Sequence, residues 1–233
     1  MQGISGDALD RLGGAIVTGA YSRGQVLRSE ELAEWLGVSR TVVREVVRVL
    51  ESMGMVAARR RVGITVQPSA NWDAYNPQLI RWRLAGDGRL DQLRSLAELR
   101  GAIEPMAARL AAQRATAEQC GELIGVAMRM VSTAKSRDLT AFLAHDIDFH
   151  RTVLAASNNP MFQQLHEVVA EVLSGRTHYH LMPDEPLPDA VRWHTEVAEA
   201  ISCGEADRAE RAMTAIADQA LIEMTDLLAG QTG

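Results

Sequence analysis

The sequence has few cysteines, prolines and aromatic residues, and it lacks long apolar runs. Two cysteines among 233 residues are too few for a disulfide framework, so we expect a reduced, cytoplasmic protein. No stretch approaches the roughly 20 apolar residues of a membrane-spanning helix, and the N-terminus has no signal-peptide pattern. Aromatic residues make up only 4% of the chain, which favours helices over an aromatic-rich sheet. We therefore expect a mainly α globular protein.

The net charge of −6 argues against binding to nucleic acid, but the charge is unevenly distributed. Residues 1–68 contain nine arginines against seven acidic residues, and six of these arginines fall within residues 38–66, where only two glutamates oppose them. The remainder of the chain is acidic. One end of the chain could therefore bind a polyanion that the rest would repel.

A polar stretch at residues 67–73, which includes Pro68, divides the chain into two predicted domains. Residues 1–68 combine short helical patterns with two β-prone pieces. Residues 69–233 show helical periodicity almost throughout, broken only by short connections, so they are predicted to form an antiparallel bundle of six or seven helices.

Within the first domain, the residues around Gly37 predict a helix-turn-helix. Residues 29–36 read as a helix that ends at Gly37, and Ser39 is placed to cap a second helix. At helical spacing this second helix presents two different faces. The apolar residues Val43, Val46, Val47 and Leu50 gather on one face, and Thr41, Arg44 and Arg48 gather on the other.

Three arginines on one helix are often no more than a solvated face, but a second basic element follows. The β-prone residues 55–58 and 64–66 are joined by a tight connection that contains Arg59, Arg60 and Arg61, and Gly63 permits a positive φ there. We expect this hairpin to lie beside the helix, so that the arginines, Arg61 included, form one surface that can position and read DNA.

In the second domain, three polar side chains fall inside apolar helical stripes. Asp146 and His150, four residues apart, lie in the middle of one stripe, and His194 lies in the middle of another. A lone inward histidine is more often a hydrogen-bonded core residue than a ligand. Three inward polar side chains together favour a binding site, in which they coordinate a metal, pair with each other or hydrogen-bond to a polar ligand. The methionines Met106, Met128 and Met130 are interpreted as core residues.

The run LRSEELAEWLGVSRTVVRE from Leu27 to Glu45, with the glycine-ended hairpin after it, resembles the winged helix-turn-helix of the GntR family of bacterial transcription regulators. The resemblance implies that four positions contact DNA and that Gly63 forms the tip of the wing. The four positions are Ser39, Arg40, Thr41 and Arg44.

The second domain is similar to the all-helical effector domain of the FadR subfamily, called FCD. The motifs that carry this similarity are ELR at residues 98–100 with Glu104, DIDFH at residues 146–150, and His194. Many FCD domains hold a divalent metal such as zinc through one aspartate and three histidines. Asp146, His150 and His194 match the first three ligands, but the fourth position is Ile216. Metal binding and direct contact between these side chains and an effector therefore both remain open.

Two further side chains are candidates for the effector pocket, the first from the resemblance and the second from its place at a helix end. Arg100 matches a position that reaches into the effector pocket, where a guanidinium would pair with a ligand carboxylate; the alternative is a salt bridge between helices. His178 falls at the end of a helix that could line the same pocket, or it belongs to a solvated helix end.

Together these features predict a homodimeric repressor that binds a palindromic operator and is released by a small carboxylate. The chain looks most like regulators of sugar-acid catabolism, such as galactonate or gluconate operons. Three alternatives remain: a metal-dependent hydrolytic enzyme built on the bundle, a regulator that responds to a fatty-acyl ligand, and an architectural DNA binder without sequence preference.

Overall fold

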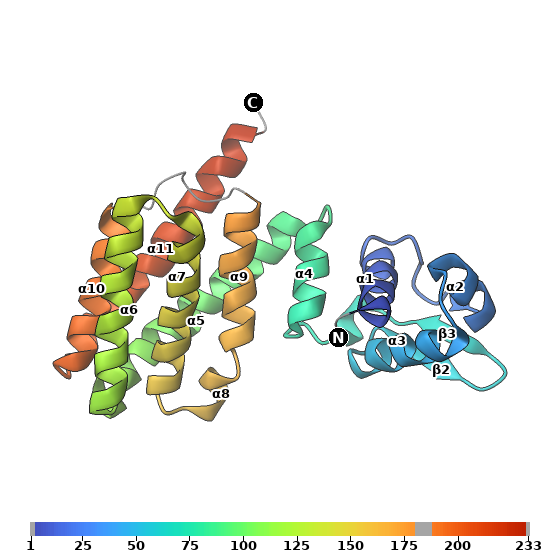
Figure 1. The fold of residues 1–233 in the computed structure, drawn as a ribbon, viewed down its shortest axis with the longest axis horizontal. Coiled ribbons are helices and arrows are strands. Elements are labelled where there is room, and N and C mark those ends of the chain that lie inside the picture. Colours follow the sequence, from blue (N-terminus) through green and yellow to red (C-terminus); the bar gives the residue numbers. More distant parts are fainter. Residues whose placement is uncertain (1–2, 180–187, 232–233) are drawn as a thin grey trace. The chain divides into compact units, whose positions relative to one another are not determined.

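The computed structural model describes residues 3–179 and 188–231, and the chain forms two compact units, Met1–Gln92 and Leu93–Gly233 (Figure 1). The first unit combines helices with a small sheet, and the described part of the second is helical, so the predicted mainly α class is confirmed. In the described residues, each helix is either too short or too polar to span a bilayer.

The first unit contains a winged helix-turn-helix. Its elements are α1 (Ile4–Val17), β1 (Val26–Leu27), α2 (Ser29–Leu36), α3 (Arg40–Ser52), β2 (Val56–Arg59), β3 (Gly63–Val66), the 3-10 turn η1 (Ser69–Asn71) and α4 (Pro77–Ala85). The strands are antiparallel in the order β1-β3-β2. Strands β2 and β3 match the two β-prone pieces, whereas β1 was not predicted, because two residues are too short to show an alternating pattern.

Gly37 and Ser39 shape the turn between α2 and α3. Gly37 ends α2 in the left-handed region with φ 70°, where glycine has no Cβ to clash. The Ser39 hydroxyl then accepts a hydrogen bond from the Val42 amide and caps α3. The four apolar residues that helical spacing assigned to the inner face of α3 are all buried: Val43, Val46, Val47 and Leu50.

Helix α4 belongs to the first unit because it packs against α1. The indole of Trp82 covers Gly13, and its Nε1 donates to Asp10 Oδ1 at 2.9 Å. Gln78 donates to the same carboxylate. The first compact unit thus contains α4 as well as the predicted domain of residues 1–68, and its boundary falls in the first turn of the next helix.

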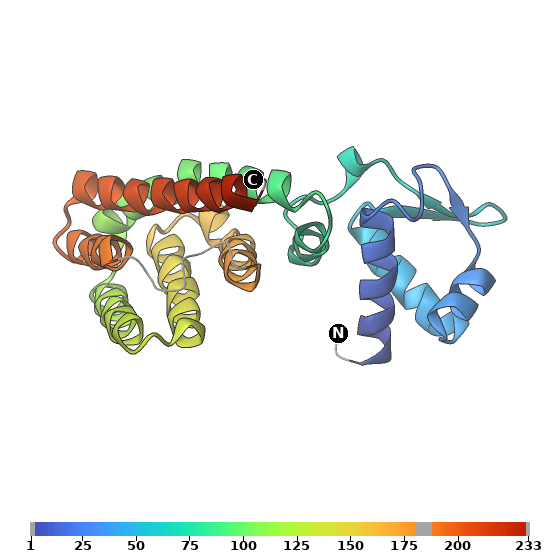
Figure 2. The ribbon, with the colours of Figure 1, turned by 90° about the horizontal axis from the view of Figure 1, so that it is seen from above.

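The described part of the second unit holds seven helices, which agrees with the predicted bundle. They are α5 (Arg89–Arg114), α6 (Ala117–Ser136), α7 (Leu139–Ala156), α8 (Pro160–Gln163), α9 (His166–His178), α10 (Pro188–Ser202) and α11 (Ala206–Gln231). Helix α6 packs on α7 and α10, α7 on α9, and α10 on α11. Arg109 of α5 joins this helix to α11, which lies over it in the view of Figure 2, because it bonds to Glu210 at 2.7 Å and to Asp207.

Apolar side chains from these helices form one core, which includes Phe149, Met213 and Ile216. Met130 is buried as predicted, but the prediction for two other methionines was wrong. Met106 is 41% exposed and Met128 55% exposed. Both lie on long helices that cover the core with one face only, so composition alone could not tell their outer positions from inner ones.

Candidate nucleic-acid interface and buried polar cluster

The outer face of α3 carries the predicted DNA-contacting side chains, and all of them are exposed. They are Ser39, Arg40, Thr41, Arg44 and Arg48. Arg40 forms an exposed ion pair with Glu30 of α2 at 3.2 Å. A pair of this kind contributes little free energy in water, so it leaves the arginine able to exchange its partner for a phosphate.

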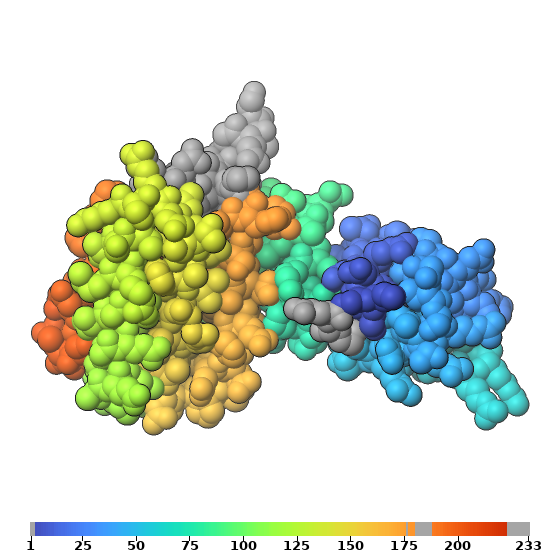
Figure 3. Space-filling model, viewed as in Figure 1, coloured from blue at the N-terminus to red at the C-terminus, as the bar shows by residue number. Residues whose placement is uncertain are grey.

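The hairpin of β2 and β3 is the second basic element. In the space-filling view it projects from the surface of the first unit, in cyan (Figure 3). Arg59, Arg60 and Arg61 are exposed, and Arg61 takes the left-handed conformation in the turn with φ 67°. Gly63 has a positive φ of 118°, as predicted, but its placement at the wing tip was wrong.

Gly63 opens β3 opposite Arg59, at the base of the turn. A Cβ there would lie 2.9 Å from the Leu27 carbonyl oxygen and 2.8 Å from Val26 Cγ1. The glycine is required because β1 approaches closely and because φ is positive.

Two side chains that the sequence did not single out hold this surface in place. Arg11 of α1 donates to the carbonyls of Leu36 at 3.0 Å and Trp35 at 2.9 Å, and so caps the end of α2. Glu51 of α3 accepts the Ala58 amide of β2 at 2.6 Å and ties the helix to the hairpin. Both contacts join residues distant in sequence, so helical periodicity could not reveal them.

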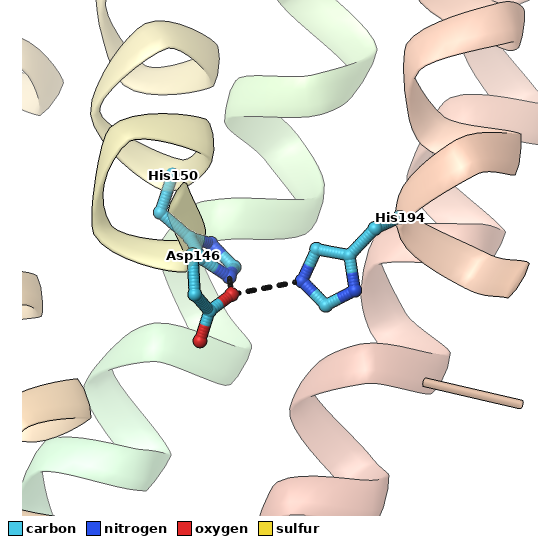
Figure 4. Close-up of side chains that lie close together, drawn as sticks. All are labelled: Asp146, His150 and His194. Atoms are coloured by element: carbon cyan, nitrogen blue, oxygen red, sulfur yellow. Dashed lines mark hydrogen bonds and ion pairs between the residues drawn. The ribbon is translucent and has the colours of Figure 1, made fainter. Parts of the chain in front are cut away.

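In the second unit, Asp146 and His150 of α7 meet His194 of α10 in the core (Figure 4). All three are buried, as predicted. Asp146 Oδ1 lies 3.0 Å from His194 Nε2 and 3.4 Å from His150 Nε2. Donor atoms of the three residues lie within 4.8 Å of one another, which is the spacing expected of a shared ligand.

Two charged side chains from α5 complete the cluster. Arg100 is 3% exposed and Glu104 is 1% exposed. The Arg100 Nε donates to Glu104 Oε1 at 3.1 Å, and the Arg100 Nη2 lies 3.3 Å from His150 Nε2. The predicted alternative of a salt bridge is therefore present, but it forms within one helix rather than between two. We call these five residues, Arg100, Glu104, Asp146, His150 and His194, the polar cluster.

The polar cluster stabilises charge in the core. Burial alone raises the pKa of Glu104, but the charges of Arg100 and His150 outweigh it and lower the pKa to about 2. Burial likewise lowers the pKa of His150, yet the charge of Glu104 and the carboxylate acceptors of Asp146 and Glu104 that face the ring nitrogens raise it to about 9. Hydrogen bonds from the two histidines overcome burial and hold the pKa of Asp146 well below its usual range.

The arrangement of His194 favours a proton or cation beside Asp146. The His194 Nδ1 lies 2.7 Å from the Ala190 carbonyl oxygen, which can only accept, so Nδ1 must carry the proton. In a neutral ring, Nε2 then presents a lone pair to a carboxylate oxygen 3.0 Å away. Two acceptors facing each other need a positive charge between them, and a divalent metal fits this donor set.

The other predicted site residues lie elsewhere in the second unit. Ile216 is 6% exposed and shares the apolar core, so its position is inward but offers only hydrocarbon. His178 is exposed at the end of α9, with its ring against Tyr179 at 4.8 Å. The structure thus places Arg100 in the polar cluster and leaves His178 outside it.

Comparison with known families agrees with the division into two units. Residues 5–66 match the family described as bacterial regulatory proteins, gntR family, and residues 95–219 match the FCD domain. The galactonate operon transcriptional repressor of Escherichia coli (strain K12) is 32% identical over 92% of this chain and 95% of its own. The HTH-type transcriptional repressor NanR of Enterobacter sp. (strain 638) is 30% identical over 83% of this chain and 74% of its own.

Solved structures share the fold. The Streptococcus agalactiae GntR structure has a TM-score of 0.50 and 25% identity, and the match covers 92% of this chain and 98% of that one. The E. coli McbR/YncC structure has a TM-score of 0.57 at 20% identity and covers 98% of this chain and 100% of that one.

Proposed function

Because the chain belongs to the GntR family of bacterial regulatory proteins and carries an FCD domain, it is a ligand-responsive DNA-binding transcription regulator and not an enzyme, and we propose that it represses a sugar-acid catabolic operon. The galactonate operon repressor of E. coli, similar over 92% of this chain, supports this substrate class. The observation that carries the proposal is the polar cluster, which offers hydrogen-bond donors and acceptors to hydroxyl and carboxylate groups inside an apolar bundle.

The DNA-binding part of the proposal uses α3 and the hairpin. The exposed face of α3, from Ser39 to Arg48, enters the major groove, where a guanidinium can bond to the O6 and N7 atoms of guanine. Arg61 contacts the phosphate backbone beside it. Gly63 acts indirectly, since it lets the hairpin close against β1. Two chains bind one palindromic operator, each with one recognition helix.

The effector-binding part uses the polar cluster. Asp146, His150 and His194 bond to hydroxyl groups of the sugar acid directly, or they would hold a divalent metal, to which they offer one carboxylate and two imidazoles. A bound metal would supply a positive charge that anchors the effector carboxylate. Since Ile216 adds no ligand, water or the effector would complete the coordination.

Arg100 adds positive charge beside the effector carboxylate. His178, exposed at the end of α9, is proposed to contact the effector from outside the cluster.

Release of DNA requires differential binding. The effector must bind the arrangement of the dimer that does not fit the operator more tightly than the arrangement that does, since equal binding shifts nothing. A response of this kind distinguishes a regulator from an architectural DNA binder, which would ignore metabolites.

The proposal is tested with the full chain and the DNA upstream of its own and neighbouring genes. We expect binding at moderate ionic strength, and release by one or a few aldonic acids, with D-galactonate and D-gluconate in the first panel. A thermal-shift assay with and without zinc measures effector binding separately, because a ligand of the folded state raises the melting temperature. Binding to DNA that no sugar acid alters, together with release by a fatty-acyl ligand, would contradict the sugar-acid assignment.

A further inference from the structure

Glu104 is the most enclosed acid of the polar cluster, and it contacts two of the cluster's other members. It lies one turn after Arg100 on α5 and is 1% exposed. Its Oε1 and Oε2 accept from Arg100 Nε at 3.1 and 3.2 Å, and Oε2 also lies 3.1 Å from Arg100 Nη2. The same Oε2 atom lies 3.3 Å from His150 Nδ1 of α7. One carboxylate therefore faces an arginine on its own helix and a histidine on another.

Two contacts place the proton of a neutral His150 ring on Nδ1. Glu104 Oε2 faces that atom at 3.3 Å, and Arg100 Nη2, which can only donate and is held by Glu104, faces Nε2 at 3.3 Å. No described group makes a hydrogen bond of good geometry with Nδ1, so Glu104 Oε2 is the acceptor that faces it. A proton held on Nδ1 makes Nε2 the nitrogen that gives up its proton when a metal binds and then presents a lone pair. Without Glu104, Nδ1 loses its acceptor and Arg100 loses the partner that holds Nη2 toward Nε2. The competing tautomer would then place the proton on Nε2, facing Asp146 Oδ1 at 3.4 Å, and the lone pair would point away from Asp146.

The two histidines reach the same arrangement by different means. His194 presents Nε2 because its Nδ1 donates to the Ala190 carbonyl of its own helix, at 2.7 Å. His150 presents Nε2 because a side chain from α5 faces its Nδ1. Partners of this kind orient histidines that hold metals or ligands, and their loss weakens metal binding. The His194 arrangement is independent of Glu104, which makes it an internal control.

Glu104 also limits how Arg100 can meet an effector. The carboxylate occupies the Nε–Nη2 edge of the guanidinium, and Nη2 turns toward His150. Both Nη2 protons then face partners, so a ligand carboxylate can bond to the guanidinium only through Nη1. The salt bridge thus fixes the orientation of Arg100 as well as the tautomer of His150.

We propose that Glu104 is a positioning residue for the effector site: it makes His150 Nε2 the atom that accepts a metal or an effector hydroxyl, and it aims the guanidinium of Arg100. The proposal rests on the proposed function, since it assumes that the polar cluster binds the effector. It adds to that function a residue that contacts the binding side chains from behind.

The first test reads the tautomer directly and needs no ligand. In ¹⁵N-edited NMR of the full chain, we expect slowly exchanging Nδ1–H protons on both His150 and His194. In Glu104→Leu, which has no acceptor, the His150 signal should be lost while the His194 signal stays. A His150 Nδ1–H that persists in Glu104→Leu overturns the proposal.

The second test measures binding of two probes, zinc and D-galactonate, to the same proteins. We expect Glu104→Leu to weaken zinc binding by roughly 10- to 100-fold and to reduce the rise in melting temperature with D-galactonate. Glu104→Asp keeps the negative charge but shortens the side chain by one methylene, so its affinity for zinc and D-galactonate should fall less. If Glu104→Leu does not fold, the affinities of Glu104→Asp test the role of Glu104. The matched control is Glu210→Leu, which removes another arginine-paired glutamate, outside the cluster.

The outcomes separate the two proposals. Wild-type affinity for both probes in a folded Glu104 variant overturns the role of Glu104 and leaves the proposed function standing. If the wild-type chain binds neither zinc nor any sugar acid, the proposed function fails, and the NMR comparison alone decides whether Glu104 sets the tautomer of His150.

Discussion

Gly13 and Gly14 are neighbours in the middle of α1, yet they have opposite surroundings. A Cβ added to Gly13 would lie 2.2 Å from the ring of Trp82, whereas one added to Gly14 would have no described atom within 4 Å beyond its own helix. The Trp82 ring can lie flat on α1 only because Gly13 has no side chain. The bond from the Trp82 indole to Asp10 fixes the ring there. Both contacts hold α4 against α1.

Alanine substitutions at these two glycines should change the free energy of unfolding in opposite directions. Alanine is favoured over glycine inside a helix by roughly 1 kcal/mol, so Gly14→Ala should stabilise the chain by up to that amount. In Gly13→Ala the clash with Trp82 exceeds this gain, and overpacking of this kind costs about 1–3 kcal/mol. Urea unfolding measures both. Equal changes in the free energy of unfolding would show that Trp82 does not pack on Gly13.

At the scale of elements, α3 owes its placement to contacts at both of its ends. Ser39 caps its first turn, and Glu51 in its last turn accepts the Ala58 amide of β2. Arg11 closes the end of α2 before the turn. The exposed arginines of α3 and of the hairpin are therefore carried on elements that are fixed to each other, which direct readout of bases requires.

Arg44→Ala tests the outer face of α3. We expect the substitution to weaken operator binding by at least about 1–3 kcal/mol, because it removes one guanidinium contact to a base or a phosphate. Effector binding in the second unit should be unchanged. Fluorescence anisotropy with an operator fragment measures the first effect, and thermal shift with an effector measures the second. Arg211→Ala is the control, since it removes an exposed arginine from α11. Wild-type DNA affinity in Arg44→Ala would refute the recognition-helix assignment.

At the scale of the whole molecule, the chain joins a DNA-binding unit rich in exposed arginines to an acidic helical unit with a charged cluster in its core. The acidic unit does not attract DNA, so we infer that affinity for the operator depends on the first unit and on how two such units are paired. A dimer doubles the number of base contacts and requires two half-sites at a set spacing.

The spacing of the half-sites tests this pairing. An insertion of about five base pairs, roughly half a helical turn, should place them on opposite faces of the DNA and abolish tight binding. An insertion of about ten base pairs restores the face and should recover part of the affinity. Light scattering of the complex should find two chains per operator. Equal affinity for all three spacings would contradict binding as a dimer with one fixed arrangement.

The sequence predicted the direction of a side chain correctly wherever helical periodicity alone decides that direction. The inward direction of Asp146, His150 and His194 and the two faces of α3 follow from about 100° of rotation per residue. The same reasoning failed where a contact depends on another element. Strand β1 and the position of Gly63 at the base of the hairpin depend on pairing across the sheet. The exposure of Met106 depends on which face of α5 the bundle covers.

The amino-acid sequence by itself determined the helical class, the separation of a basic from an acidic part, and the residues that turn toward the core, because these depend on composition and on local geometry. Only the tertiary structure decided which of the inward groups meet. Arg100 and Glu104, Asp146 and His150, and His194 come from three helices far apart in the chain, and the packing of α5, α7 and α10 brings them within bonding distance. The partner of each charge is a property of that packing.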